Sequence, residues 1–499
     1  MTQTSFKRDI SLSLAFGFIL CFCFCYFLTV NPFTLYSGYD PSIFEQMGLG
    51  MLQGRIPYVD LFDHKGFLLY VINAIGIWMA PGHTGIYILL SLCLSLTFFL
   101  WLRISDVLVH PSLRYFPALI TLLFALTCEG GNMTETWSLL AISLPIYYLV
   151  GYICQGQPIG LRRCFFIGIC IGIVANLRLN NIVPAFAVCV YMFIDLCCKK
   201  EFLKLTYSVL TVLAGFCLVT LSLVALYVGL YGTQYLEDYW FCNIGFNLLY
   251  VDQFTHEPLW KAPGLYFPLS MLILMLCTAR NLRNRLAWFT LMAFLLTLLT
   301  TGSAYFAHYF TLFSPLVVLS ISLSMGKTLC ISRRGMRRIG VAAILLLAVT
   351  AGIFHKFIRQ KAENFAQREK AIAECRDVLC SLSDGQKASI WNYNTMMTGA
   401  NILTSSGLVQ SNRVFLTFQT DGDYGVTETG TLEEMRPEII LIDEQTQWNS
   451  GDSREALESR GPVEDSIFIA QNYRLLHRSS TLLQEKRVCI YALLPPRHD

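Results

Sequence analysis

The chain has 499 residues, of which 54% are apolar and only 14% are charged. Soluble domains carry about 25% charged residues, so this composition excludes an ordinary soluble protein. A net charge of +3, without a long tract of Lys and Arg, also excludes a nucleic-acid partner. Of the 71 charged residues, 35 lie from Ile358 onward. We therefore expect two parts, a lipid-embedded body over residues 1–357 and a water-soluble domain over residues 358–499.

Apolar runs long enough to cross a bilayer recur throughout the first part of the chain. Eleven such runs cover residues 10–30, 85–103, 114–128, 137–153, 164–177, 181–198, 205–230, 263–279, 286–301, 308–326 and 339–357. The first run follows Lys7 and Arg8 as in a signal peptide, but it is about 20 residues long and lacks a small-residue cleavage site. We expect it to be retained as a transmembrane helix. The sequence thus predicts a polytopic all-α body of eleven transmembrane helices.

A twelfth apolar run, residues 67–80, is about 14 residues long, which is short for a hydrocarbon core of about 30 Å. If this run does not cross, the loops on one side of the membrane contain seventeen basic residues. The loops on the other side contain four basic and ten acidic residues. By the positive-inside rule, the basic loops and the N-terminus are then cytoplasmic. Residues 67–80 would lie in the outer interface or be re-entrant within the protein. Four features are then extracytoplasmic: a first loop (31–84), a short loop (129–136), an acidic loop (231–262) and the C-terminal domain.

The C-terminal domain alternates helical and strand patterns. A helix is predicted at Arg359–Leu382, followed by strands at Ser389–Tyr393, Val414–Phe418 and Pro437–Ile442 and by a hairpin pair at Tyr473–His477 and Arg487–Leu493. These patterns indicate a small α/β domain. It contains neither a glycine-rich phosphate loop nor a metal-ligand spacing, so we expect it to assist a reaction rather than to catalyse one.

The first predicted extracytoplasmic loop contains an aspartate directly after the first membrane helix. Asp40 stands in the stretch Ser37-Gly38-Tyr39-Asp40-Pro41, just before a helix-like segment over Ser42–Leu52. One interpretation is that Asp40 and Ser42 cap this helix. The other is that Asp40 is a general base, which accepts the proton of an acceptor hydroxyl while a lipid phosphate departs.

The same loop continues with Asp60, Asp63, His64 and Lys65 in close succession. Asp60, Asp63 and His64 carry carboxylate and imidazole groups that can hold a divalent cation, although such groups in a loop more often form a solvated turn or a hydrogen-bonded scaffold. Lys65 would either neutralise a phosphate or extend its ammonium group to the membrane interface.

Four further polar residues lie at the predicted outer ends of spans: Glu129, Glu135, Arg178 and His308. Glu129 and Glu135 would orient an acceptor or cap helices. Arg178 is the only basic residue of its loop, and its guanidinium suits a phosphate bidentately; the alternative is an ion pair with one of these carboxylates. His308, with Tyr309, fits an aromatic belt at the interface better than a catalytic role.

These motifs together resemble a known superfamily. A membrane helix, the Asp40 loop, the stretch GRIPYVDLFDHKG (54–66) and an in-plane apolar helix follow in the order typical of the GT-C glycosyltransferases. The likeness is greatest to the family 39-like enzymes, which include protein O-mannosyltransferases and lipid A aminoarabinose transferases. GGNMTE at Gly130–Glu135 and AHYFTLFSP at Ala307–Pro315 also resemble members of this group.

The resemblance implies a GT-C-like transmembrane catalytic body and a sugar donor carried on a polyprenyl phosphate, used on the outer face. It also implies that the first-loop aspartate, Asp40 here, is the catalytic base. The chain departs from the pattern twice. Asp40-Pro41 replaces the Asp-Glu pair of the mannosyltransferases, and Lys65-Gly66-Phe67 replaces Lys-Pro-Pro or Lys-Gly-Pro.

Two hypotheses about function follow. In the first, the protein is an inverting glycosyltransferase that passes a sugar from a polyprenyl-phosphate donor to a glycan, lipid or protein of the cell envelope, with a divalent cation as its one candidate cofactor. In the second, it is a non-enzymatic lipid or polymer transporter, or a protein whose C-terminal domain binds a partner. The apolar runs are almost empty of charged residues at their centres, whereas transport calls for ionisable groups there. The sequence therefore favours the enzyme.

Overall fold

The structure is a computed structural model that describes most of the chain. The described residues are 14–15, 17–22, 32–128, 131–250, 262–278, 285–300, 306–326, 365–393, 398–415, 426–428, 430–443, 468–480 and 487–495. The predicted span 339–357, most of the span 10–30 and the candidate residue Glu129 lie outside them.

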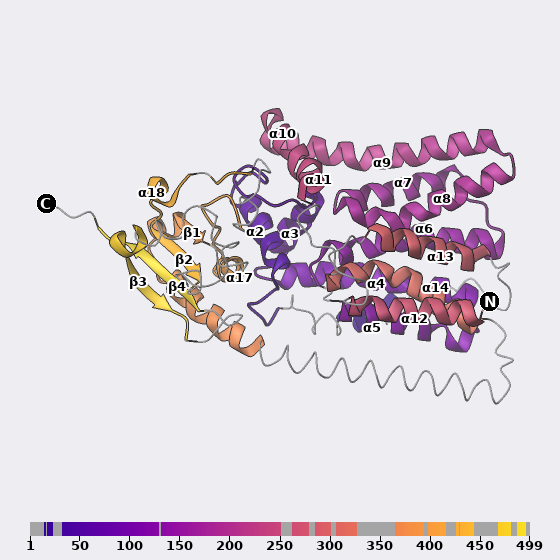
Figure 1. Cartoon of the computed structure of the whole chain (residues 1–499), viewed down its shortest axis with the longest axis horizontal. Helices are drawn as coiled ribbons and strands as arrows, with labels where there is room; N and C mark the ends of the chain where they lie inside the picture. The colour runs from indigo at the N-terminus through magenta and orange to yellow at the C-terminus, as the bar shows by residue number, and fades with distance from the viewer. Residues whose placement is uncertain are drawn as a thin grey trace.

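Nine of the predicted spans are helices that run along one another in a bundle (Figure 1). They are α4 (Thr84–Leu108), α5 (Tyr115–Thr127), α6 (Thr134–Gln155), α7 (Leu161–Ala175), α8 (Val183–Cys198), α9 (Phe202–Tyr231), α12 (Pro263–Thr278), α13 (Arg285–Thr300) and α14 (Ser314–Met325). Within the described part of the chain, five helical segments are long and apolar enough to cross a membrane. The all-α membrane body expected from the sequence is therefore confirmed.

Small residues determine how closely two of these helices approach. A Cβ atom added at Gly168 of α7 would lie 2.0 Å from the carbonyl oxygen of Val212 in α9, and one at Gly215 of α9 would lie 2.2 Å from that of Phe165. Such contacts let two backbones touch, which is how membrane helices associate when the surrounding lipid is as apolar as their side chains. The remaining surface of α9 is largely exposed, as expected for a helix that faces lipid.

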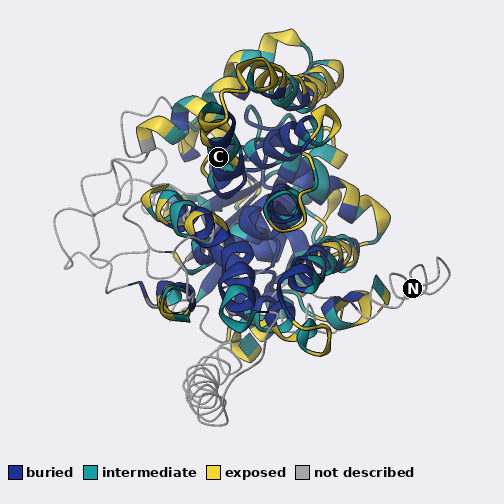
Figure 2. Ribbon diagram, turned by 90° about the vertical axis from the view of Figure 1, so that its right-hand side faces the viewer, coloured by how far each residue is buried: buried dark blue, intermediate teal, exposed yellow. Residues whose placement is uncertain are grey.

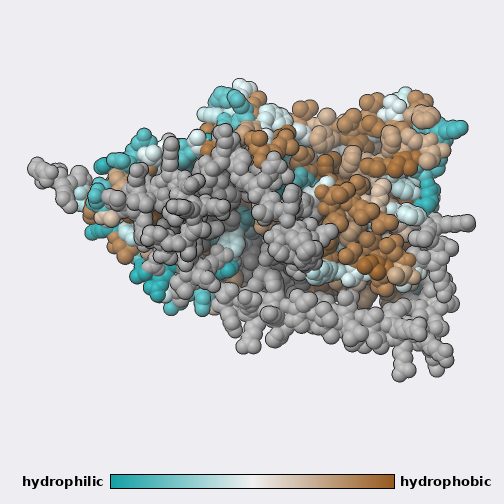
Figure 3. Space-filling view, viewed as in Figure 1, coloured by the Kyte–Doolittle hydropathy of each residue, from teal (hydrophilic) through white to brown (hydrophobic). Residues whose placement is uncertain are grey.

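Burial and hydropathy are arranged as in a multi-pass membrane protein. Buried residues collect at the centre of the bundle, and the outer faces of the peripheral helices are exposed (Figure 2). On the face seen in Figure 3, hydrophobic residues predominate over the described part of the bundle, and hydrophilic residues gather at its far end and on the described part of the C-terminal domain. An apolar belt between polar ends matches a bilayer between two aqueous phases.

Two short helices of the first loop lie at the end of the bundle next to the C-terminal domain (Figure 1). They are α2 (Asp40–Leu52) and α3 (Phe67–Met79), which pack against each other because Gly48 brings α2 onto Asn73 and Ala74. A helix of 13 residues such as α3 is only ~20 Å long, shorter than the hydrocarbon core. A buried ion pair of 3.2 Å between Glu45 and His83 ties α2 to the start of α4.

A series of short helical turns follows α9 and covers the first loop. It comprises η3 (Thr233–Tyr235), α10 (Leu236–Trp240), a π-helical turn (Phe241–Gly245) and α11 (Phe246–Tyr250). Other short turns are η1 (Pro111–Leu113), η2 (Leu179–Ile182) and η7 (Ala307–Phe313).

The C-terminal domain contains a four-stranded sheet in the order β1-β2-β4-β3. Its strands are β1 (Ile390–Tyr393), β2 (Ile439–Asp443), β3 (Tyr473–Arg478) and β4 (Val488–Leu493); β1 and β2 are parallel, and the other pairs are antiparallel. Its helices are residues 365–380, α16 (Asp384–Ala388), α17 (Thr398–Ser405) and α18 (Leu432–Met435). The small sheet domain predicted from the sequence is confirmed.

One predicted strand, Val414–Phe418, lies only partly within the described residues. Val414 forms an isolated parallel bridge with Phe62 of the first loop, and residues 416–425 lie outside the described chain. The apolar run at Val414 and Phe415 is explained by burial in the same core as the membrane bundle. Because the C-terminal domain and the first loop are in contact, they must lie on the same side of a membrane that the bundle spans.

The sequence predicts which side this is. We expect reporter fusions after Ala80, Arg103 and Lys361 to report outside, inside and outside, because α3 is too short to cross and the basic loops stay in the cytoplasm. An inside signal after Ala80 would contradict the eleven-span topology.

Candidate functional site

Most of the polar residues singled out in the sequence meet where the first loop rests on the bundle. The charges that act on the Lys65 ammonium come from Asp63, Arg178, Asp40 and Glu135. Asp40 is the first residue of α2, Glu135 lies in the first turn of α6, and Arg178 lies between α7 and η2. Three segments that are far apart in sequence therefore share one electrostatic neighbourhood.

Asp40 does not act as an N-cap. The N-cap residue of α2 is Tyr39, and its side chain makes no capping hydrogen bond. The hydroxyl of Ser42 donates instead to the carbonyl of Tyr39 at 2.7 Å. Asp40 is only partly buried and lies in the first helical turn, where the helix dipole favours a carboxylate. The structure thus leaves its side chain at the helix start, within electrostatic range of Asp63 and Lys65.

Tyrosine hydroxyls fix the segment from Asp63 to Lys65. The hydroxyl of Tyr70 donates to the Asp63 carboxylate at 2.9 Å and accepts from the backbone N–H of Lys65 at 3.1 Å. The hydroxyl of Tyr58 donates to the Lys65 carbonyl at 2.9 Å, and the Asn247 amide donates to the His64 carbonyl at 2.9 Å. The backbone on both sides of Lys65 is therefore held in one position.

Burial decides the charge states of this segment. It lowers the pKa of His64 well below its usual value, and the neighbouring Lys65 and Arg178 charges lower it further. The imidazole is thus neutral and can accept a hydrogen bond from the Lys65 ammonium, whose Nζ lies 2.7 Å from His64 Nε2. Burial also raises the pKa of the Asp63 carboxyl and lowers that of Lys65, whereas their mutual attraction opposes both shifts.

Gly66 brings this segment against the loop that bears Arg178. Its N–H donates to the Leu177 carbonyl at 3.1 Å, and a Cβ atom at Gly66 would lie 1.9 Å from the carbonyl oxygen of Asn176. Only glycine allows so close an approach. The glycine of the Lys65-Gly66-Phe67 stretch therefore has a structural reason.

Arg178 is paired with a carboxylate. Its Nη1 lies 2.9 Å from Glu135 Oε1, and its Nη2 donates to the Tyr309 hydroxyl at 2.7 Å. The Glu135 side chain has no exposed surface, and that of Arg178 is 18% exposed. Burial lowers the pKa of Arg178, but Tyr309 and Glu135 outweigh it, so the pKa is raised and the guanidinium stays charged. These bonds use two of its five N–H donors.

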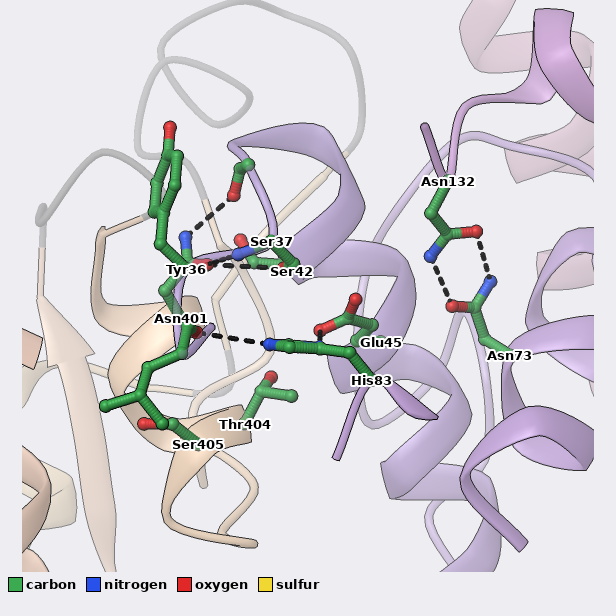
Figure 4. Close-up of polar contacts among 12 residues, drawn as sticks. Tyr36, Ser37, Ser42, Glu45, Asn73, His83, Asn132, Asn401, Thr404 and Ser405 are labelled. Atoms are coloured by element: carbon green, nitrogen blue, oxygen red, sulfur yellow. Dashed lines mark hydrogen bonds and ion pairs between the residues drawn. The ribbon is translucent and has the colours of Figure 1, made fainter. Parts of the chain in front are cut away.

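The GGNMTE segment positions Glu135. The amide groups of Asn132 and Asn73 bond each other, with Asn132 donating at 2.6 Å, and the Trp137 indole donates to Asn132 at 2.9 Å. Figure 4 shows Asn132 and Asn73 facing each other. The Thr134 hydroxyl donates to the second oxygen of Glu135 at 2.9 Å. Glu135 is thus an ion-pair partner rather than a helix cap.

Asp60 lies apart from this cluster. Its carboxylate accepts a hydrogen bond from the backbone N–H of Ile56 at 2.7 Å, as in a scaffolding turn. Across the residues that the structure describes, no group of three or more His, Cys, Asp or Glu is placed to hold a metal ion. The cation site proposed for Asp60, Asp63 and His64 is therefore not formed, because Asp60 bonds its own turn and Asp63 bonds Tyr70.

His308 is buried beside the cluster rather than exposed in a belt. Its ring stacks on Phe306 with centroids 5.7 Å apart and meets the Tyr309 ring edge-on at 4.6 Å. His308 lies in η7, one residue before Tyr309, whose hydroxyl accepts a hydrogen bond from Arg178.

Sequence reasoning missed the side chains that position the cluster. Tyr70 and Asn73 stand three residues apart in an otherwise apolar helix, so they share a face of α3. Two polar residues on one face of an apolar helix would have indicated a buried contact. Tyr58 carried a weaker signal, because tyrosine is common at interfaces.

Neither a protein-family model nor a curated protein sequence matches the chain. Among solved structures, ArnT from Cupriavidus metallidurans bound to undecaprenyl phosphate matches over 98% of both chains, with a TM-score of 0.57 and 10% sequence identity. The chain has a GT-C-like fold. The fold expected from the sequence resemblance is thereby confirmed, including the membrane body and the small C-terminal domain.

The close approach at Gly66 can be tested directly. We expect Gly66→Ala to lower the free energy of unfolding by about 1–3 kcal/mol or more, because the new methyl group must push Asn176 away. Thermal melting of the purified protein measures this. Gly160→Ala is a matched control, since nothing lies within 4 Å of its added Cβ. An equal melting temperature for Gly66→Ala and wild type would contradict the contact.

Proposed function

We propose that this protein is a membrane glycosyltransferase that takes a sugar from a polyprenyl-phosphate donor and passes it to a hydroxyl of a cell-envelope acceptor on the extracytoplasmic face. The observation that carries the proposal is the arrangement of Asp40, Lys65 and Arg178: the contact of Gly66 with Leu177 brings Lys65 to the Arg178 loop, and the charge of Asp40 acts on Lys65. It combines a carboxylate that can take a proton with two cations that can receive a phosphate. The likeness in fold to ArnT, which was crystallised with undecaprenyl phosphate, supports the same donor class.

The proposed reaction is a single displacement. The acceptor oxygen attacks C1 of the donor sugar, and the bond between C1 and the phosphate oxygen breaks. The electron pair of that bond leaves with the polyprenyl phosphate, and the acceptor proton passes to the carboxylate of Asp40. One displacement inverts the configuration at C1.

Lys65 and Arg178 would stabilise the charge that develops on the leaving phosphate. The Lys65 ammonium bonds a neutral imidazole, so its positive charge is not cancelled by that neighbour. Arg178 keeps further N–H donors beyond its bonds to Glu135 and Tyr309, and its planar group suits phosphate oxygens. We assign the donor phosphate to these two residues. The acceptor, a glycan, lipid or protein, would approach from the side of Asp40.

The role of Asp40 can be tested with an isosteric variant. Asp40→Asn keeps the size of the side chain but cannot take up the proton, so we expect turnover to fall by about 10²–10⁴-fold. In cells that carry only this variant, mass spectrometry should show the polyprenyl-phosphate-linked sugar accumulating and the modified envelope product disappearing.

Asp60→Asn is the matched control, because an amide oxygen can still accept the bond from Ile56 and Asp60 lies outside the cluster. It should leave both lipid-linked sugars and envelope products unchanged. Normal products in the Asp40→Asn strain would exclude Asp40 as the base.

Arg178 as a phosphate ligand requires a separate measurement. Arg178→Lys keeps the charge and loses the planar fork, so we expect undecaprenyl phosphate to bind about tenfold more weakly, which corresponds to about 1.4 kcal/mol. Binding to the purified protein in nanodiscs measures this.

Arg285→Lys provides the comparison, because Arg285 also pairs with a carboxylate, that of Asp195. This pair joins α13 to α8 at the ends predicted to be cytoplasmic. That substitution should leave the affinity for undecaprenyl phosphate unchanged. Equal affinities for wild type and Arg178→Lys would remove Arg178 from the phosphate site.

A further inference from the structure

One side chain of the C-terminal domain holds the backbone that leads into α2. Asn401 lies in α17 and is 1% exposed. Its Oδ1 accepts hydrogen bonds from the backbone N–H of Ser37 at 2.9 Å and from the Ser37 hydroxyl at 3.2 Å, and its Nδ2 donates to the Gly38 carbonyl at 2.7 Å. Figure 4 shows Asn401 reaching across to Ser37. Three hydrogen bonds thus converge on the two residues that stand just before Tyr39 and Asp40.

These bonds of Asn401 form a clamp on Ser37 and Gly38, and a second clamp holds the two residues before them. The Glu369 carboxylate accepts hydrogen bonds from the backbone N–H groups of Leu35, at 2.9 and 3.0 Å, and of Tyr36, at 2.7 Å. The Arg368 guanidinium donates to the Tyr36 hydroxyl at 2.9 Å. Residues 35–38 are therefore bound one after another by the C-terminal domain.

The direction in which Asp40 points depends on this segment. Gly38 has a φ of 120°, a conformation that favours glycine. The side chain of Tyr39 makes no capping hydrogen bond to α2. The backbone at Ser37 and Gly38 therefore determines where the first turn of α2 begins. With Asn401 removed, the buried groups of both residues would lack their partner, and the segment could relax only by moving.

We propose that Asn401 is a positioning residue for Asp40, so that the C-terminal domain completes the catalytic site from outside the membrane body. This inference rests on the proposed function, in which Asp40 is the general base. Asn401 touches neither the donor phosphate ligands nor the site of proton transfer. It acts by holding the Asp40 carboxylate at a fixed distance from the acceptor hydroxyl, where a displacement of about 1 Å can cost about 10²-fold in rate.

Kinetics of the full-length protein test the proposal. We expect Asn401→Ala to lower kcat 10- to 100-fold while the KM for the lipid-linked donor stays within about twofold, because Lys65 and Arg178 are untouched. In an Asp40→Asn background, Asn401→Ala should lower the remaining rate no further. A loss of equal size in both backgrounds would show a general structural role and overturn the proposal.

Gln53→Ala is the matched control. The Gln53 amide also donates to a backbone carbonyl of the C-terminal domain, that of Gly407 at 3.1 Å, but at the opposite end of α2. We expect wild-type kcat for this variant. Should Asn401→Ala fail to fold, Asn401→Asp keeps the side-chain size and the acceptor oxygen and loses the donor to Gly38. It should give an intermediate kcat, and a wild-type kcat would contradict the proposal.

Hydrogen exchange separates this inference from the proposed function. The backbone amide of Ser37 should exchange faster in Asn401→Ala than in wild type or Gln53→Ala, whatever reaction the protein catalyses. Unchanged exchange would overturn the clamp itself. If Asp40→Asn keeps full activity, the assignment of Asp40 as the general base fails; if Asp40→Asn is inactive and Asn401→Ala keeps wild-type kcat, only the positioning role fails.

Discussion

The candidate site depends on one backbone contact, the meeting of Gly66 with Asn176 and Leu177. It joins the first loop to the connection between α7 and α8, and a side chain at residue 66 would prevent it. Because Lys65 and Arg178 flank this contact, two positive charges are brought together inside an apolar body. That arrangement is costly unless counter-charges are near, and Asp40, Asp63 and Glu135 provide them.

The buried pair of Arg178 and Glu135 has a further consequence. Removing one member of such a pair leaves an uncompensated charge and typically costs about 3–5 kcal/mol. The Tyr309 hydroxyl and the Thr134 hydroxyl satisfy additional atoms of the two groups, which lowers the cost of burying them. The guanidinium is therefore held in one orientation before any ligand arrives. Preorganisation of this kind is what stabilisation of a departing phosphate requires.

The helices were predictable because lipid demands long apolar runs, and nine such runs are helices in the described chain. Asp63, His64 and Lys65 were predictable as a group because they are adjacent in sequence. The pairing of Arg178 with Glu135 was only one of two open alternatives, since 43 positions separate them and no local pattern encodes the contact. For Asp60 the sequence left a cation site or a hydrogen-bonded turn open, because its chemistry matches that of Asp63 and only the turn at Ile56 distinguishes them.

The C-terminal domain was expected to be a separate water-soluble unit, because its charge density differs from that of the body. In the structure, the C-terminal domain packs directly against the membrane body. Ala400, Val409 and Val414 belong to the same apolar core as the bundle, and Gln46 of α2 donates to Thr404 and to the Leu408 carbonyl, each at 2.9 Å. A helix of 13 residues is marginal alone, so α2 owes its stability to α3 on one side and to α17 on the other. The start of α2 is therefore held from both sides, and the position of a carboxylate placed there depends in part on contacts with the C-terminal domain.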